Sequence, residues 1–156
     1  MTLEGLNEDF RDIVVAFADS EVDFVVVGAF ALAFHGAPRA SGDIDLFVRP
    51  SSENATKVVT ALMQFGAPLT SHGIGEADFA RPGTVYQMGL PPRRIDVLTE
   101  ISGVTFDDVW ASRVPVDVED RRIHIIGREA FLKNKAASGR PKDLADIARL
   151  KRISPK

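Results

Sequence analysis

The sequence contains no cysteine, which excludes disulfide bonds, thiolate metal ligands and cysteine nucleophiles. Any metal ion bound by this chain must therefore take oxygen or imidazole ligands. No apolar stretch approaches the length needed to span a bilayer, and residues 1–8 carry acidic residues where a secretion signal would need an apolar core. The formal net charge of -3 provides no overall positive field for nucleic acid. We therefore expect a cytoplasmic protein that makes no membrane contact.

The composition is ordinary for a folded domain. Of the 156 residues, 45% are hydrophobic and 26% are charged. This length is enough to bury one core, and the sequence shows no internal repeat, low-complexity tract or linker. We therefore expect a single domain over residues 1–156.

The hydrophobic pattern alternates between helical and extended segments. Helical spacing marks residues 7–18, and a β-branched run from Phe24 to Val27 ends at Gly28, where a second helix is expected. Residues 70–83 show no clear period and are expected to form a loop. The other expected elements are a strand over 44–48, a helix capped by Ser51 or Ser52, strands over 84–88 and 94–98, a short helix from Thr105 to Trp110, strands over 114–118 and 122–126, and helices over 129–137 and from Pro141 toward Lys151. This order predicts an α+β fold whose mixed β-sheet has helices packed mainly on one face.

Three aspartates on two expected strands carry the chemical signal. Asp43 and Asp45 are two positions apart, so their carboxylates project from the same face while Ile44 and Leu46 enter the core. Like charges held together repel, and a cation between them relieves the repulsion. Asp96 lies between apolar residues on another expected strand. Together the three carboxylates would form a site for Mg²⁺ or Mn²⁺ that acts on phosphate groups.

The residues also allow plainer interpretations. An Asp-x-Asp pair at a strand start is also typical of a solvated turn. Gly28 would let backbone N–H groups approach a phosphate, but glycine is also what a tight strand-to-helix turn requires. Arg39 and Ser41 would either contact a phosphate or hold the loop before the acid pair. Gln87 would face the site only if its strand pairs with that of Asp96.

Three separated segments resemble the minimal nucleotidyltransferases of the polymerase-beta-like superfamily. The segments are G-A-F-A-L from Gly28, P-R-A-S-G-D-I-D-L-F-V from Pro38 and R-I-D-V-L from Arg94. Within this superfamily the likeness is strongest to AbiEii-type, toxin–antitoxin-associated proteins, whose K…GRPKDLAD signature is similar to residues 135–146. The likeness spans nearly the whole chain and implies a nucleotidyltransferase fold.

The resemblance also implies roles for individual residues. Asp43, Asp45 and Asp96 match the catalytic and metal-binding acids, with Asp96 either a ligand or an aid in deprotonating the acceptor hydroxyl. The residues expected to bind the nucleotide are Gly28, Ala29, Arg39, Ser41, Lys135 and Asp143.

Some of these residues depart from the pattern or have other uses. Many superfamily members have a second glycine or a serine at the position of Ala29, so a hydroxyl contact to phosphate is lost here. Lys135 is expected to reach the phosphates as a point charge. Asp143 lies in the first turn of an expected helix, where an acid is favoured whatever its function. Asp146 is expected to be structural and to pair with Lys142 one turn earlier.

The leading hypothesis is a metal-dependent nucleotidyltransferase. It would use an NTP with Mg²⁺ or Mn²⁺ and transfer a nucleoside monophosphate to a hydroxyl of a protein or of an RNA such as a tRNA end. The alternative is a non-catalytic binding module, either one component of a toxin–antitoxin pair with a cognate toxin or antitoxin as partner, or a nucleotide sensor. A third hypothesis is hydrolysis of phosphoesters by the same acids. All three depend on the three aspartates converging in space.

Overall fold

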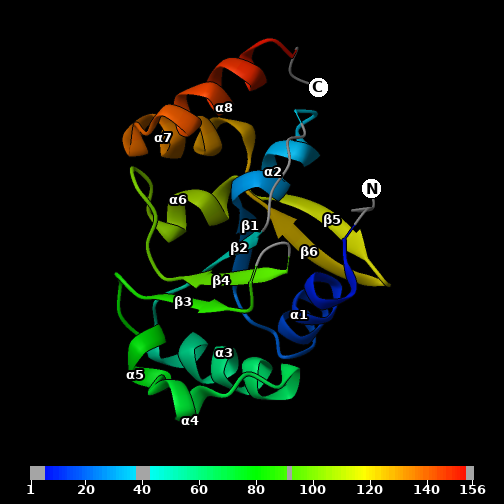
Figure 1. Ribbon diagram of the computed structural model, residues 1–156, viewed down its shortest axis with the longest axis vertical. Helices are drawn as coiled ribbons and strands as arrows, with labels where there is room; N and C mark the ends of the chain where they lie inside the picture. The colour runs from blue at the N-terminus through cyan, green and yellow to red at the C-terminus, as the bar shows by residue number, and fades with distance from the viewer. Residues whose placement is uncertain (1–5, 38–42, 91–92, 154–156) are drawn as a thin grey trace.

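The computed structural model describes residues 6–37, 43–90 and 93–153, and its strands form one mixed sheet (Figure 1). The strands are β1 Phe24–Val27, β2 Asp43–Val48, β3 Val85–Met88, β4 Arg94–Leu98, β5 Val114–Val118 and β6 Arg121–Ile125. The helices are α1 Glu8–Asp19, α2 Gly28–Phe34, α3 Ser52–Phe65, α4 Leu69–His72, α5 Glu76–Phe79, α6 Phe106–Ala111, α7 Arg128–Ser138 and α8 Pro141–Lys151. The α+β class and the mixed sheet predicted from the sequence are confirmed.

The strand order is β3-β4-β2-β1-β6-β5. β2 runs parallel to β4 and antiparallel to β1, while β3 and β5 pair antiparallel with β4 and β6 at the two ends of the sheet. The parallel pairing of β2 with β4 sets Asp45 directly opposite Asp96, and Asp43 opposite Arg94. This register determines which polar side chains meet on one face of the sheet.

The opposite face of β2 belongs to the hydrophobic core. Ile44, Leu46 and Val48 have no exposed surface, and burying a side chain of this size contributes about 1.5–3 kcal/mol. Figure 1 shows α1, α3, α4 and α5 grouped on one side of the sheet. The N-terminus of α3 is capped by Ser51, whose hydroxyl accepts a hydrogen bond from the backbone N–H of Asn54 at 3.2 Å.

A second group of helices lies on the other side of the sheet, where Figure 1 shows α6, α7 and α8. The α6 helix, expected from Thr105 to Trp110, begins with a reciprocal capping box between Thr105 and Asp108. Asn134 on α7 donates a hydrogen bond at 2.9 Å to the backbone oxygen of Ser102, which ties α7 to the segment after β4. These helices therefore stand over the face that carries the aspartates.

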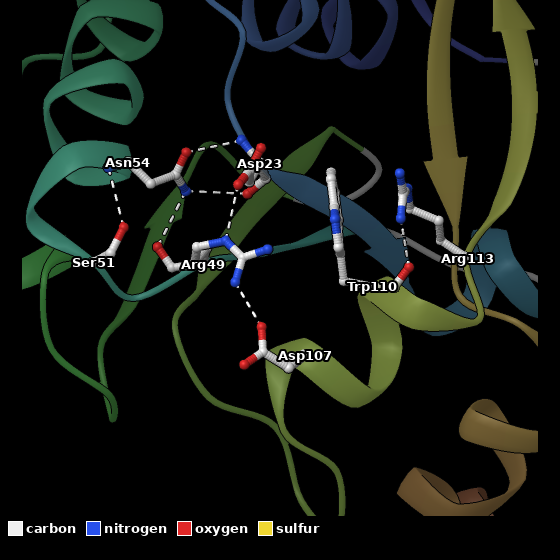
Figure 2. A network of polar contacts seen from close by, with 7 residues as sticks. All are labelled: Asp23, Arg49, Ser51, Asn54, Asp107, Trp110 and Arg113. Atoms are coloured by element: carbon white, nitrogen blue, oxygen red, sulfur yellow. Dashed lines mark hydrogen bonds and ion pairs between the residues drawn. The ribbon is translucent and has the colours of Figure 1, made fainter.

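A polar network joins the end of β2 to α3 and α6 (Figure 2). Arg49 donates hydrogen bonds to the Asp23 carboxylate at 2.8 Å and to the Asp107 carboxylate at 2.6 Å. The Asn54 side chain accepts from the Asp23 N–H at 2.8 Å and donates to the backbone oxygens of Asp23 and Arg49, each at 3.1 Å. Asn54 is buried, and both hydrogens and the oxygen of its amide form hydrogen bonds that hold α3 to two strand ends. The network lies at the opposite end of β2 from Asp43.

The loop expected over residues 70–83 is wrong in part, because this segment contains most of α4 and all of α5. Each helix is a single turn and buries one large apolar side chain, Leu69 in α4 and Phe79 in α5. Asp78 accepts a hydrogen bond at 2.9 Å from the N–H of Gly75 and so holds the start of α5. A helix of one turn shows no repeating stripe, so periodicity cannot reveal it. None of the helices in the described ranges is long and apolar enough to cross a membrane.

Candidate active site

The three aspartates converge. Asp43 and Asp45 project from β2 and Asp96 projects from β4, and one carboxylate oxygen of each lies within 4.8 Å of the others. Asp96 is 5% exposed, so at least one of the three charges is held away from water. The alternation of strand side chains predicted the pair on β2, and the register of β2 with β4 adds Asp96. The geometry that every functional hypothesis required is therefore present.

The sequence interpretation missed Arg94, as it missed Arg140 and Lys142, which also line this site. The Arg94 guanidinium donates to Asp43 Oδ2 at 2.6 Å and to the two carboxylate oxygens of Asp96 at 3.1 and 3.3 Å. It therefore bridges two of the three aspartates. The signal was available, because Arg94 and Asp96 are two positions apart on one strand and must share a face. The contact to Asp43 depends on the register between strands.

The proximity of the three acids alters the protonation of Asp45. Burial, the charges of Asp43 and Asp96 and a hydrogen bond with Asp96 raise the pKa of Asp45 to about 7, while the Lys135 ammonium acts in the opposite direction. Near neutral pH, Asp45 therefore carries a proton for a large part of the time. A metal ion bound between Asp43, Asp45 and Asp96 would act in the same direction as the Lys135 ammonium and favour the charged form of all three acids.

Gly28 lies directly against the Asp45 carboxylate. Its φ is +71°, and a Cβ built on it would collide with Asp45 Oδ2. Glycine is needed here both for the backbone conformation and for the close approach of the carboxylate. Gly28, which the sequence placed at a strand-to-helix junction, thus also leaves the space that the Asp45 carboxylate occupies.

We expect Gly28→Ala to lower the free energy of unfolding by about 1–3 kcal/mol, since the new methyl group adds a clash to the cost of a positive φ. Gly73→Ala is the matched control, because Gly73 has φ +68° and nothing within 4 Å of the added Cβ. Urea denaturation of the two variants separates the clash from the backbone cost. Equal destabilisation of both variants would mean that Asp45 moves aside freely.

Cationic side chains form the wall opposite the aspartates. Lys135 on α7 is 6% exposed, and its ammonium lies 3.2 Å from Asp143 Oδ1 and 3.7 Å from Asp146 Oδ2. Arg140 donates to Asp143 Oδ2 at 2.7 Å. Burial would raise the pKa of Asp143, but the hydrogen bonds from Arg140 and Lys135 outweigh it and lower that pKa below its usual value. The two aspartates of α8 therefore hold the cations in place.

This arrangement corrects one expectation. Asp146 was expected to pair with Lys142 one turn earlier. In the structure it is buried and lies against Lys135 on the neighbouring helix, a contact that was not predicted. Asp143 has no exposed surface, so it contributes through Lys135 and Arg140 and has no face open to a ligand. Asp143 and Asp146 are buried because α7 packs against this side of α8. The sequence of α8 alone does not reveal which side α7 covers.

The aspartates and the cations face one hollow of about 330 Å³. Most of the expected site residues line it. Gln87 lines it because β3 pairs with β4 and sets Gln87 opposite Asp96. Ala29 is buried in α2 and is not among the lining residues. Arg39 and Ser41 lie outside the described residues. The lining residues named by sequence or structure are Gly28, Asp43, Asp45, Gln87, Arg94, Asp96, Lys135, Arg140 and Lys142.

Comparison with known proteins gives one family and a shared fold. The family model described as "Nucleotidyl transferase of unknown function (DUF2204)" matches residues 6–156. The search of curated proteins found no match. At the low sequence identities of the solved structures that follow, structural likeness shows the fold alone.

Three solved structures superpose over nearly the whole chain. A candidate nucleotidyltransferase from Thermotoga maritima has a TM-score of 0.59 at 14% identity, covering 95% of this chain and 96% of its own. A lincomycin-bound lincosamide antibiotic adenylyltransferase has a TM-score of 0.57 at 16% identity, with 96% and 98% covered. An antigenic nucleotidyltransferase-like protein from Paracoccidioides brasiliensis has a TM-score of 0.53 at 15% identity, with 96% and 78% covered.

Proposed function

We propose, from the premise that this chain belongs to the nucleotidyl transferase family DUF2204, that it is a metal-dependent enzyme moving a nucleoside monophosphate from an NTP to a hydroxyl acceptor. Nucleotidyl transfer is the reaction class of the family. The observation that carries the finer proposal is the convergence of Asp43, Asp45 and Asp96 across one hollow from Lys135 and Arg140. A triphosphate with a divalent cation has charges of both signs, and this hollow has both.

The donor set fits Mg²⁺ or Mn²⁺. Three carboxylate oxygens within 4.8 Å of one another are hard ligands at a spacing that one or two small cations can bridge. The Arg94 guanidinium already lies between Asp43 and Asp96, so a metal ion held by these carboxylates would have to displace it from at least one of them. A bound metal ion would neutralise and orient the phosphate oxygens. Asp43, Asp45 and Asp96 would hold it.

The chain's own side chains then have separate tasks. The acceptor oxygen forms a bond to the α-phosphorus, and the bond from that phosphorus to its bridging oxygen breaks as pyrophosphate leaves. Asp96 takes the proton of the acceptor hydroxyl and passes it to solvent. Lys135 and Arg140, held by Asp143, offset the charge on the phosphate oxygens. Arg94 must release at least one carboxylate, so we assign it a positioning role.

The direct test is transfer of label from α-labelled NTPs to candidate hydroxyl acceptors, proteins and tRNA included, with Mg²⁺ or Mn²⁺ present. We expect label in the acceptor together with release of pyrophosphate, and loss of both when the metal is chelated. Tight NTP binding without transfer to any acceptor or to water would contradict the enzymatic proposal. Phosphate release with water as the only acceptor would instead support the phosphoesterase hypothesis.

A second candidate function is a non-catalytic binding module. The ion pairs of Arg94 with Asp43 and Asp96 favour it, since they occupy the oxygens that a metal would need. The AbiEii-type likeness supports a place in a toxin–antitoxin pair with a cognate protein partner, and a nucleotide sensor would use the same hollow. Stoichiometric capture of one partner protein, with no label transfer, would favour this function over the first.

Metal affinity should depend on pH through Asp45. Because the pKa of this carboxyl is raised to about 7 in the metal-free protein, a metal ion must displace a proton below that pH. We expect the apparent affinity for Mn²⁺ to rise by up to about tenfold per pH unit below pH 7 and to level off above it. Calorimetric titration of Mn²⁺ between pH 5.5 and 8.5 measures this. A flat profile would show that Asp45 is not a ligand.

A further inference from the structure

A second hollow of about 400 Å³ opens beside the candidate active site. It is lined by Gly83, Val85, Glu100, Ile101, Ser102 and Gly103. Val85, Ile101 and Ser102 also line the hollow that contains the three aspartates. The two hollows therefore adjoin at these three residues, and the aspartates lie in the hollow next to the second one.

The two hollows are arranged along one strand. Arg94, Asp96 and Leu98 alternate on β4 and line the first hollow, and Glu100, two positions further on, lines the second. The neighbouring strand sets Val85 opposite Leu98. At about 3.3 Å per residue, at most roughly 13 Å of chain separates Asp96 from Glu100. The surface between the two acids is apolar, because Leu98 is half-buried and Val85 is 55% exposed.

The floor of the second hollow is held in place by several contacts. Thr99 donates from its backbone N–H to Thr84 O at 3.0 Å, and its hydroxyl accepts from the Thr84 N–H at 2.8 Å. The Ser102 carbonyl accepts a hydrogen bond from the Asn134 side-chain amide at 2.9 Å. Gly103 packs so closely on α7 that a Cβ would collide with Ala137. The position of Glu100 between these anchors is therefore well determined by the fold.

The charges at the two ends of the combined hollow are opposite. Lys135, Arg140 and Lys142 lie at the end where the triphosphate would bind. Glu100 is exposed, and within the described ranges it forms no hydrogen bond or ion pair. A ligand reaching this end therefore meets a carboxylate that can accept hydrogen bonds from a cation without first losing a protein partner.

We propose that the second hollow binds the acceptor, and that the acceptor is a small alcohol that carries a cationic group. This inference rests on the proposed nucleotidyl transfer. The hydroxyl lies near Asp96 and Gln87, the body of the molecule packs on Leu98 and Val85, and the ammonium or guanidinium group pairs with Glu100. The acceptor oxygen forms the new bond to the α-phosphorus, pyrophosphate leaves, and the hydroxyl proton goes to Asp96.

The same charge disfavours an RNA 3′ end at this place. A polynucleotide would bring phosphates toward Glu100, and proteins that bind RNA through its backbone use cationic side chains there. The formal net charge of -3 gives no compensating attraction over the whole chain. An acceptor with its own positive charge removes the conflict.

The test uses two matched disaccharides, cationic diglucosamine and its neutral N,N′-diacetyl counterpart, with tRNA as a third acceptor. We expect label transfer from the NTP to diglucosamine and little or none to the other two. Glu100→Gln should raise the KM for diglucosamine roughly two- to fivefold, as loss of an exposed ion pair predicts, and leave the KM for the NTP unchanged. Glu53→Gln, an exposed acid on α3, is the control.

A binding measurement separates this inference from the proposed reaction. Calorimetric titration of diglucosamine into the protein needs no turnover, and Glu100→Lys should abolish the binding. If no NTP is turned over yet diglucosamine binds through Glu100, the reaction proposal fails and the acceptor site stands. Transfer to tRNA that is unaffected by Glu100→Gln, or equal use of the two disaccharides, would overturn the inference.

Discussion

The Asp45→Asn variant is expected to lose about 10³-fold in nucleotidyl transfer and, at the same time, to be more stable than the wild-type protein. The loss follows because one of three oxygens that would hold the metal disappears, and about 4 kcal/mol of transition-state stabilisation corresponds to this factor. The gain in stability has a separate cause, which is the burial of the Asp45 charge together with its repulsion by Asp43 and Asp96. Function and stability therefore oppose each other at this position.

The pH dependence of that stability gain follows from the sign of the pKa shift. The pKa of Asp45 rises from 3.8 to about 7 on folding, so between these values the folded protein keeps a proton that the unfolded chain releases. The carboxyl group therefore costs stability as the pH rises through this window. We expect Asp45→Asn to gain on the order of 2–4 kcal/mol near pH 8 and almost nothing near pH 4.

Urea denaturation of the metal-free protein at both pH values measures the gain, and label transfer measures the loss. Asp12→Asn is a suitable control because Asp12 is exposed on α1. A variant that retains transfer would remove Asp45 from the active site. A variant equally stabilised at both pH values would mean that the buried and repelled charge of Asp45 is not the cause.

The Lys135→Met variant is expected to lose about 3–5 kcal/mol of unfolding free energy, the usual result of removing one partner from a buried ion pair. Lys135 lies between Asp143 and Asp146, which are 0% and 2% exposed. Without the ammonium, Arg140 still pairs with Asp143, and Asp146 loses the Lys135 cation that lies 3.7 Å from its Oδ2. The cost therefore arises at both buried aspartates, with a smaller part from the lost packing of Lys135 on the Phe131 ring.

Two further variants make this expectation specific. The Lys135→Met and Asp146→Asn double variant should recover a substantial part of the lost stability, because it also removes one of the two buried negative charges that Lys135 offsets. Lys133→Met, on the exposed face of the same helix, should change stability by no more than about 0.5 kcal/mol. Thermal and urea denaturation would both report these differences. Failure of the double variant to recover stability would assign the loss to packing instead of charge.

Much of the candidate site follows from local patterns that the sequence contains. Asp43 and Asp45 share a face because strand side chains alternate, and the same rule would have placed Arg94 beside Asp96. Gly28 ends a β-branched run, so the strand-to-helix junction could be predicted from its neighbours. The helix caps at Ser51 and Thr105 are also local signals, and helices begin at the following residues. Each of these inferences needs only a few consecutive residues.

The tertiary structure decided the contacts between segments, which the hydrophobic periodicity of a single segment does not contain. The parallel register of β2 with β4 brings Asp45 opposite Asp96 and lets Arg94 reach Asp43. Packing of α7 on α8 turns Lys135 toward Asp143 and away from water. Alternation and helical spacing are properties of single segments, whereas strand order and helix docking minimise exposed apolar surface over the whole chain. The sequence alone therefore determined the chemistry of each side chain and its face, and only the folded core decided which faces meet.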